Sequence, residues 1–235
     1  SEKSKHTFER WVVTILLIIG GLIVSLPFIW MISSSFKPES EILQMPPTLF
    51  AENPTLDNYI SLFTNMNFGI YLKNTLIIVA LSFVGLFFNA MAGYGFAKYN
   101  FKGKDKIFYL VLATMMIPGQ VTMIPVYLLL NEMGLINTML GIVLPGLAAA
   151  FSIFLFRMFM ATIPTDLIEA ARLDGAGDFY IFFRLIIAIS KPIFAVQVIL
   201  TFIAAWNSFL WPLIIANDES LYTLSVGLSL LKGQY

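Results

Sequence analysis

The chain has 235 residues, of which 58% are hydrophobic and 12% are charged, and its formal net charge is zero. Soluble domains carry about 25% charged residues, so a chain this apolar is predicted to be an integral membrane protein. Zero net charge argues against nucleic acid as a partner, and the absence of cysteine excludes a disulfide framework and a thiolate metal site.

Five apolar runs are long enough to cross a bilayer as helices. The first begins at Trp11, and its apolar core is too long for a cleaved signal peptide, so we expect a retained anchor. We therefore expect an all-α polytopic membrane protein, with a single transmembrane domain over residues 1–235. The expected spans cover about 11–33, 74–97, 107–130, 139–160 and 188–216.

Within and between these spans, small residues favour close packing of helices and prolines interrupt them. Prolines exclude a long helix over residues 33–73, although 56–63 could form a short surface helix. The second span has small residues suited to close helix packing. These residues are Gly85, Ala90, Ala92, Gly93 and Gly95, and the breaks in later spans are Pro118-Gly119, Pro125 and Pro145-Gly146.

Positive charge sets the expected orientation. With a cytoplasmic N-terminus, eleven of the fourteen Lys and Arg residues face the cytoplasm, and only Lys37, Lys73 and Lys232 lie outside. This distribution satisfies the positive-inside rule in every loop. The loop over residues 161–187 is therefore expected to be cytoplasmic.

That loop carries Asp166, Glu169, Arg172, Asp174 and Asp178, and these five charged residues would together cost about 12–18 kcal/mol to bury in a bilayer. We expect a short helix with Pro164 in its first turn and with Asp166 and Glu169 at capping-box spacing. Gly175 fits the left-handed residue that ends a helix, and Asp178 could cap the next turn. The apolar residues 179–183 are expected at the membrane surface.

Here the chain resembles a family. Glu169-Ala170-Ala171, Asp174-Gly175-Ala176 and Ser190-Lys191-Pro192 are similar to the "EAA loop" of membrane subunits of ATP-binding-cassette (ABC) importers. In that family the loop is a coupling helix that docks on a cytoplasmic ATPase. The resemblance implies docking through Glu169, Ala170, Ala171, Asp174 and Gly175; the alternative is an ordinary amphipathic loop.

The resemblance extends over nearly the whole chain, with one departure. The family usually has Leu-Pro before Ser190, whereas this chain has Ile187-Ala188, which gives no reason to expect a kink there. Residues 116–125, 134–138 and 205–212 resemble the carbohydrate-uptake branch, in particular the maltose-type second membrane subunits. Family members usually have a sixth span, so we expect this chain to stop short of it; the alternative is a five-span protein.

Other chemistries find little support in the sequence. No G-x-x-x-x-G-K-[ST] or H-E-x-x-H occurs, so we expect no cofactor on this chain, with ATP and magnesium on a partner ATPase. Residues 175–178 match the G-x-G-D of intramembrane aspartyl proteases, but no span holds the required carboxylate pair. An ATPase-independent secondary carrier remains the alternative, although such carriers normally need ionisable groups within the membrane.

Candidate contacts with a substrate are the uncharged polar groups in mid-span positions. They are Asn89, Gln120, Gln197 and Asn207, and Trp206 could stack on a sugar ring. The alternative is that the amides join neighbouring helices and that the tryptophan anchors the chain at the outer interface.

The sequence therefore predicts a permease subunit of an ATP-driven sugar importer, not an enzyme itself. The resemblance implies a prokaryotic inner-membrane location and three kinds of partner: a second permease subunit, a cytoplasmic ATPase dimer and an extracytoplasmic sugar-binding protein.

Overall fold

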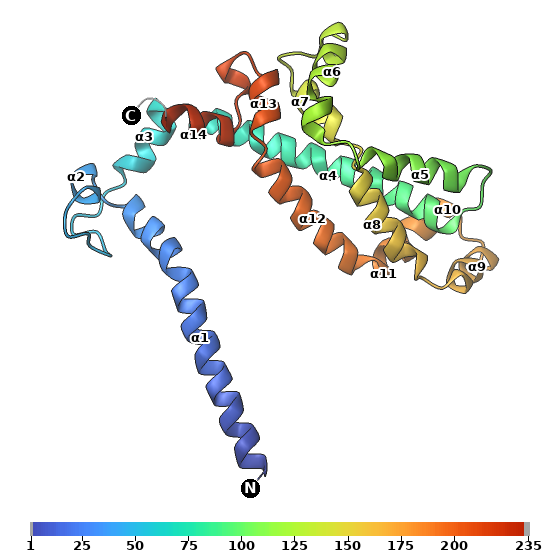
Figure 1. Cartoon of the computed structure of the whole chain (residues 1–235), viewed down its shortest axis with the longest axis horizontal. Helices are drawn as coiled ribbons and strands as arrows, with labels where there is room; N and C mark the ends of the chain where they lie inside the picture. Colours follow the sequence, from blue (N-terminus) through green and yellow to red (C-terminus); the bar gives the residue numbers. More distant parts are fainter. Residues whose placement is uncertain (1, 233–235) are drawn as a thin grey trace. The chain divides into compact units, whose positions relative to one another are not determined.

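The computed structural model describes residues 2–232, which form helices and no strand. It divides into two units, residues 1–67 and 68–235 (Figure 1). The first unit contains α1 (Glu2–Ser35), α2 (Glu39–Ile42) and α3 (Asp57–Asn65). The part of α1 from Phe8 to Ser35 has a mean hydropathy of 2.7, and its side chains are largely exposed, as expected for a lipid-facing helix.

After α1, hydrogen bonds between side chains and the backbone hold the polar segment that leads to α3 in a fixed conformation. Lys37 is fully buried, donates a hydrogen bond to the carbonyl oxygen of Thr48, and lies over the ring of Trp30. The Glu41 carboxylate accepts hydrogen bonds from the backbone N–H groups of Glu52 (3.0 Å) and Asn53 (2.8 Å). The expected short surface helix is present as α3.

The second unit is built around α4 (Phe68–Lys98), which packs against α8 (Ala150–Ala161) and α12 (Lys191–Trp206) (Figure 1). Shorter helices complete it. They are α5 (Lys104–Thr114), α6 (Gly119–Glu132), α7 (Met139–Val143), η1 (Leu144–Gly146), α9 (Thr165–Leu173), α10 (Asp178–Tyr180), the π-helix η2 (Ile181–Ile186), α11 (Ile187–Ile189), α13 (Leu210–Ile215), η3 (Glu219–Leu221) and α14 (Leu224–Lys232).

Three of the expected spans are bent. The segment expected as the third span consists of α5 and α6, which meet at 101°, as a broken span or a re-entrant loop. Pro118 causes this break because it has no N–H to donate and disfavours helical geometry at Ile117. The pair α7–η1 meets α8 at 43°, and the segment from α10 to α11 meets α12 at 83°. This last bend follows Ser190, so the family's usual proline at position 188 is not needed for it.

Two apolar cores lie along α4. One joins α4, α8, α9 and η2 and includes Phe156, Met160, Ile168, Ile181 and Ile186. The other joins α4 to α6, α7 and α13. Because α4 contributes to both cores, it connects the α9 end of this unit to the end that carries α7 and α13 (Figure 1).

Close approach of α4 and α8 depends on Gly93. A Cβ atom at this position would lie 2.5 Å from Cβ of Phe156 and 2.9 Å from the backbone nitrogen of Arg157. Gly85 faces the backbone of Leu147 in the same way, at 2.8 Å. Gly95, predicted to share this face, meets nothing within 4 Å. The small-residue surface is thus narrower than the sequence indicated.

We expect Gly93→Ala to destabilise the protein by roughly 1–3 kcal/mol, because the added methyl group must push α8 away. Gly95→Ala on the same helix is the matched control, since its methyl group enters open space. Thermal unfolding of both purified variants in detergent measures the difference. Equal melting temperatures would contradict the packing described here.

Candidate functional site

The loop with the coupling-helix resemblance folds into α9, but its first turn differs from the prediction. Pro164 has ψ 129° and is the N-cap residue, one position before the helix, so it does not belong to the first turn. No side chain caps this end, and the predicted capping box of Asp166 and Glu169 is wrong. The physical reason is that the N-cap position holds a proline, which has no side-chain acceptor.

The C-terminal end of α9 has the predicted geometry. Gly175 has φ +85°, the left-handed conformation that glycine adopts without steric cost. Its N–H donates to the carbonyl of Arg172, and the N–H of Ala176 donates to that of Ala171, both at 3.0 Å. This pair of bonds is a Schellman motif, which fixes the direction in which the chain leaves α9.

The two faces of α9 have different surroundings. Ile168 is only 3% exposed and lies in the apolar core, and Ala171 packs against the same core. On the other side Leu167, Ala170 and Leu173 follow one another at intervals of three residues and are exposed, Leu173 to 89%. Glu169 is exposed and makes no ion pair with any described residue. The helix thus shows a small apolar surface beside a free carboxylate.

Arg172 connects the end of α9 to the following turn. Its guanidinium donates to the Asp178 carboxylate at 2.9 Å and lies 5.8 Å from the ring centroid of Tyr99. Arg172, followed by the Tyr99 hydroxyl, holds the pKa of Asp178 below its usual value, so the pair is charged at neutral pH. The prediction that Asp178 caps the next turn is wrong, because its carboxylate is engaged by Arg172 and Gly177 is the N-cap residue.

Lys98, the last residue of α4, connects that helix to the segment before α9. Its ammonium group donates to the carbonyl oxygens of Ala161 (3.3 Å) and Ile163. These carbonyls have no partner within α8, so the lysine satisfies them. The segment that leads into α9 is therefore attached to α4.

The apolar residues after Asp178 are divided between core and surface. Ile181 and Phe182 are buried, and Phe182 packs against Tyr94 with ring centroids 5.4 Å apart. Phe179, Tyr180 and Phe183 are exposed. The structure thus places two of the five residues expected at the membrane surface in the protein core, since they start a helix that packs on α4.

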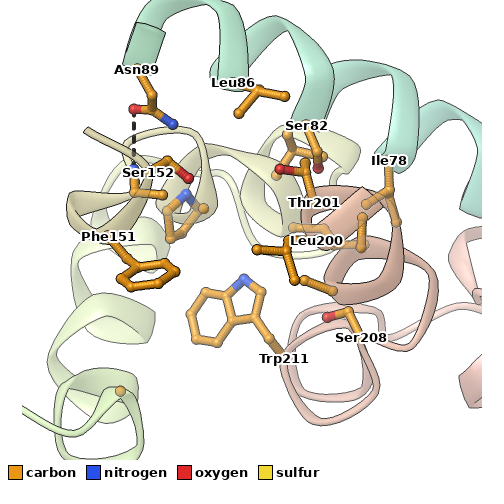
Figure 2. Close-up of a pocket in the computed structure, with 18 of the residues that line it drawn as sticks. Ile78, Ser82, Leu86, Asn89, Phe151, Ser152, Leu200, Thr201, Ser208 and Trp211 are labelled. Carbon is orange, nitrogen blue, oxygen red and sulfur yellow. Dashed lines mark hydrogen bonds between the residues drawn. The ribbon is translucent and has the colours of Figure 1, made fainter. Parts of the chain in front are cut away.

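At the other end of the unit, a cavity of about 750 Å³ lies between α4, α6, α7, α8, α12 and α13 (Figure 2). This volume is within the range of ligand sites in proteins. Of the sequence-predicted substrate contacts, Asn89, Gln120 and Gln197 line it. Further polar lining residues, which sequence reasoning missed, are Ser82, Thr122, Ser152, Thr201 and Ser208.

Trp206 and Asn207 do not line this cavity. Trp206 stacks on Phe202 with centroids 5.4 Å apart, and the amide of Asn207, the C-cap residue of α12, donates to the carbonyl of Ile203 in that helix at 2.9 Å. The tryptophan in the cavity wall is Trp211, whose indole N–H donates to the carbonyl of Gly141 at 3.2 Å (Figure 2).

A helical pattern in the sequence could have shown which residues near the end of α12 line the cavity and which do not. Gln197, Thr201 and Ala205 recur at intervals of four and share one face of α12, which lines the cavity, and Ser208 follows in the turn after this helix. Residues 206 and 207 fall outside that series. In the part of the chain that the structure describes, no group of three His, Cys, Asp or Glu side chains could hold a metal ion.

Comparisons with known proteins agree with this architecture. Residues 89–231 match the family described as binding-protein-dependent transport system inner membrane component. The chain is 37% identical over 232 residues to the permease protein AraQ of an arabinooligosaccharides transport system from Bacillus subtilis, covering 96% of this chain and 82% of AraQ. It is 34% identical to the permease NgcG of a diacetylchitobiose uptake system from Streptomyces coelicolor, covering 91% and 72% of the two chains.

A solved structure is also similar. The crystal structure of a bacterial ABC transporter involved in the import of the acidic polysaccharide alginate matches 95% of this chain and 79% of its own, with 26% identity and a TM-score of 0.82. The fold is thus that of a multi-pass, all-α permease of the prokaryotic inner membrane. The chain belongs to the family of binding-protein-dependent inner membrane components, and it is a permease subunit of an ABC importer. The alternative of an ATPase-independent carrier receives no support.

We expect Arg172→Gln to loosen α9, because it removes the ion pair that connects this helix to Asp178. Hydrogen exchange of the amides in residues 165–173 should become about twofold to fivefold faster. Arg184→Gln is the matched control, since Arg184 is exposed and makes no ion pair among the described residues. Unchanged exchange in Arg172→Gln would show that the pair does not hold α9.

Proposed function

We propose that this chain forms half of the translocation pathway of a sugar importer and receives the force for transport through α9. The observation that carries this proposal is the exposed series Leu167, Ala170 and Leu173, beside the unpaired Glu169, on a helix that is fixed to the protein by Ile168. An apolar surface with a free carboxylate fits a cleft on a partner protein that supplies a positive charge.

The partner at α9 is, in this proposal, one subunit of an ATPase dimer that binds ATP and magnesium. No phosphate-binding motif occurs in this chain, and its family acts in ABC importers. Hydrolysis therefore belongs to the separate ATPase. The charge distribution supports a cytoplasmic location for α9 and the N-terminus, where ATP is available. A second, similar permease subunit provides the other half of the pathway.

Sugar is the proposed cargo. Three relatives are named for sugars: arabinooligosaccharides, diacetylchitobiose and, in a 31% identical permease from Rhizobium radiobacter, lactose. Permeases from Brucella that are 29% identical are named for sn-glycerol 3-phosphate instead. An extracytoplasmic binding protein delivers the sugar to the complex, as the family description implies. The cavity between α4, α8 and α12 is the part of this chain through which the sugar passes.

The contacts of α9 provide a path for the force. ATP binding closes the ATPase dimer and moves α9, which follows as a rigid body because its end is held by the Schellman motif and by Arg172. Ile168 transmits the movement to the core that it shares with α4 and α8. These two helices also carry Asn89 and Ser152 in the cavity wall, so the cavity changes shape with α9.

Gly175→Val should abolish ATP-dependent sugar uptake by the whole transporter in proteoliposomes. Valine in the left-handed region costs roughly 1–2 kcal/mol or more, so the exit from α9 changes direction. Gly177→Val is the matched control, because Gly177 has φ −76° and open space around it. Normal uptake by the Gly175 variant would contradict a coupling role for this turn.

Glu169→Lys tests the docking surface itself. The exposed carboxylate has no partner ion among the described residues, so its replacement leaves the fold intact but repels a basic partner. We expect insertion in the membrane to be normal, and both co-purification of the ATPase and uptake to be lost. Co-purification at the wild-type level would exclude Glu169 from the docking surface.

A further inference from the structure

The polar side chains that line the cavity are all uncharged. They are Ser82, Asn89, Gln120, Thr122, Ser152, Gln197, Thr201 and Ser208, and no Asp, Glu, Lys, Arg or His is among the described lining residues. Hydroxyl and amide groups can exchange hydrogen bonds with a hydroxyl-rich ligand. An anionic ligand would lose its hydration in this part of the pathway without meeting a cation, which is unfavourable.

The two buried amides of this wall differ in their hydrogen bonds. Asn89 uses both of its polar atoms on the backbone: its Nδ2 donates to the carbonyl of Leu147 at 3.1 Å, and its Oδ1 accepts from the N–H of Ala149 at 3.2 Å (Figure 2). This amide holds the loop before α8 against α4. It has a structural role and is satisfied without a ligand.

Gln197 is satisfied on one side only. It is 1% exposed, and its Oε1 accepts a hydrogen bond from the Ser152 hydroxyl at 2.8 Å, while its Nε2 has no partner among the described residues. Reversing the amide would leave the oxygen free in place of the nitrogen, so one polar atom lacks a partner in either orientation. A buried amide atom of this kind, in a cavity wall, is suited to a ligand that supplies the missing hydrogen bond.

Trp211 adds an apolar face to the same cavity (Figure 2). The bond from its indole N–H to Gly141 fixes the ring, so the ring needs no partner from the ligand. A fixed aromatic face is suited to the apolar face of a sugar ring, whose hydroxyl groups point outward around it. Phe151, also in the wall, widens this apolar surface.

We propose that this cavity is a binding subsite for an uncharged oligosaccharide, in which Trp211 packs against a sugar ring and Gln197, oriented by Ser152, bonds to a sugar hydroxyl. The inference rests on the proposed function and deepens it, because it places sugar recognition in the membrane as well as in the binding protein. It also separates this chain from relatives with an anionic cargo, such as the transporter of the acidic polysaccharide alginate.

The test uses the whole transporter in proteoliposomes with its binding protein saturated with sugar, and measures the sugar imported per ATP hydrolysed. The double variant Ser152→Ala/Gln197→Met removes both hydrogen-bonding partners together, so neither is left unpaired in the wall. We expect the double variant and Trp211→Leu each to lower the sugar imported per ATP hydrolysed about fivefold to tenfold. Stimulation of the ATPase by the binding protein should stay within about twofold of the wild type. Trp206→Leu, outside the cavity, is the matched control and should keep the ratio.

A second measurement tests the charge class of the ligand. Saturation-transfer NMR on the complex in nanodiscs, without the binding protein, uses lactose and an arabinooligosaccharide as neutral probes and glycerol 3-phosphate as an anionic probe. We expect transfer to the neutral probes only, and its loss in Trp211→Leu. If a variant does not assemble, Thr201→Val and Trp211→Phe replace it, and both should weaken the signal of the neutral probes.

The two proposals fail in different ways. If the wild-type complex imports no saccharide with any binding protein, the proposed function is wrong. If the wild-type complex imports saccharide, two results overturn the subsite alone. One is that the cavity variants import as much sugar per ATP hydrolysed as Trp206→Leu does. The other is that glycerol 3-phosphate gives as much saturation transfer as lactose. Equal loss of ATPase stimulation and uptake would assign Gln197 and Trp211 to packing and would also overturn the subsite.

Discussion

Close packing of α4 against α8 is the interaction on which both functional regions depend. Gly93 lets the two backbones meet, and the apolar core around Phe156 and Met160 forms at this crossing. On one side of the crossing, the same pair of helices holds Ile168 of α9, and on the other side it carries Asn89 and Ser152 in the cavity wall. A displacement of α9 therefore cannot be absorbed locally, because a packed core transmits strain to the helices that form it.

Side chains satisfy the backbone at several of the irregular segments. Lipid offers no hydrogen bonds, so a broken helix at membrane depth must find partners within the protein or in a water-filled cavity. Asn89 supplies two such bonds to the loop between η1 and α8, and Lys98 supplies one to the last residue of α8 and one just beyond it. Near α13, the left-handed Asn137 accepts hydrogen bonds from the N–H groups of Asn217 and Asp218. These polar residues permit the bends that open a cavity inside the helix bundle.

The sequence predicted the features that depend on composition and local conformation. The apolar runs, the charged segment before α10, the short helix α3 and the left-handed turn at Gly175 could all be predicted from residue type and spacing. The features that depend on the direction in which a side chain points could not be predicted. Trp206 and Trp211 are equally apolar and are five residues apart, but only Trp211 faces the cavity, because α12 ends at Trp206 and the chain turns before α13 begins. The ion pair between Arg172 and Asp178 likewise follows no local sequence pattern and could not be predicted.

The uncharged cavity agrees with the proposal that a separate ATPase supplies the energy. A carrier driven by a proton or a sodium ion needs an ionisable or ion-binding group whose occupancy changes together with substrate binding. The cavity wall holds hydroxyls, amides and an indole ring, none of which titrates near neutral pH. In the proposed subsite, binding of a neutral sugar changes no charge and involves no side chain that exchanges a proton near neutral pH. In the proposed function the free energy enters as a mechanical displacement, and α9, exposed on one face and fixed in the core on the other, is the element of this chain suited to receive it.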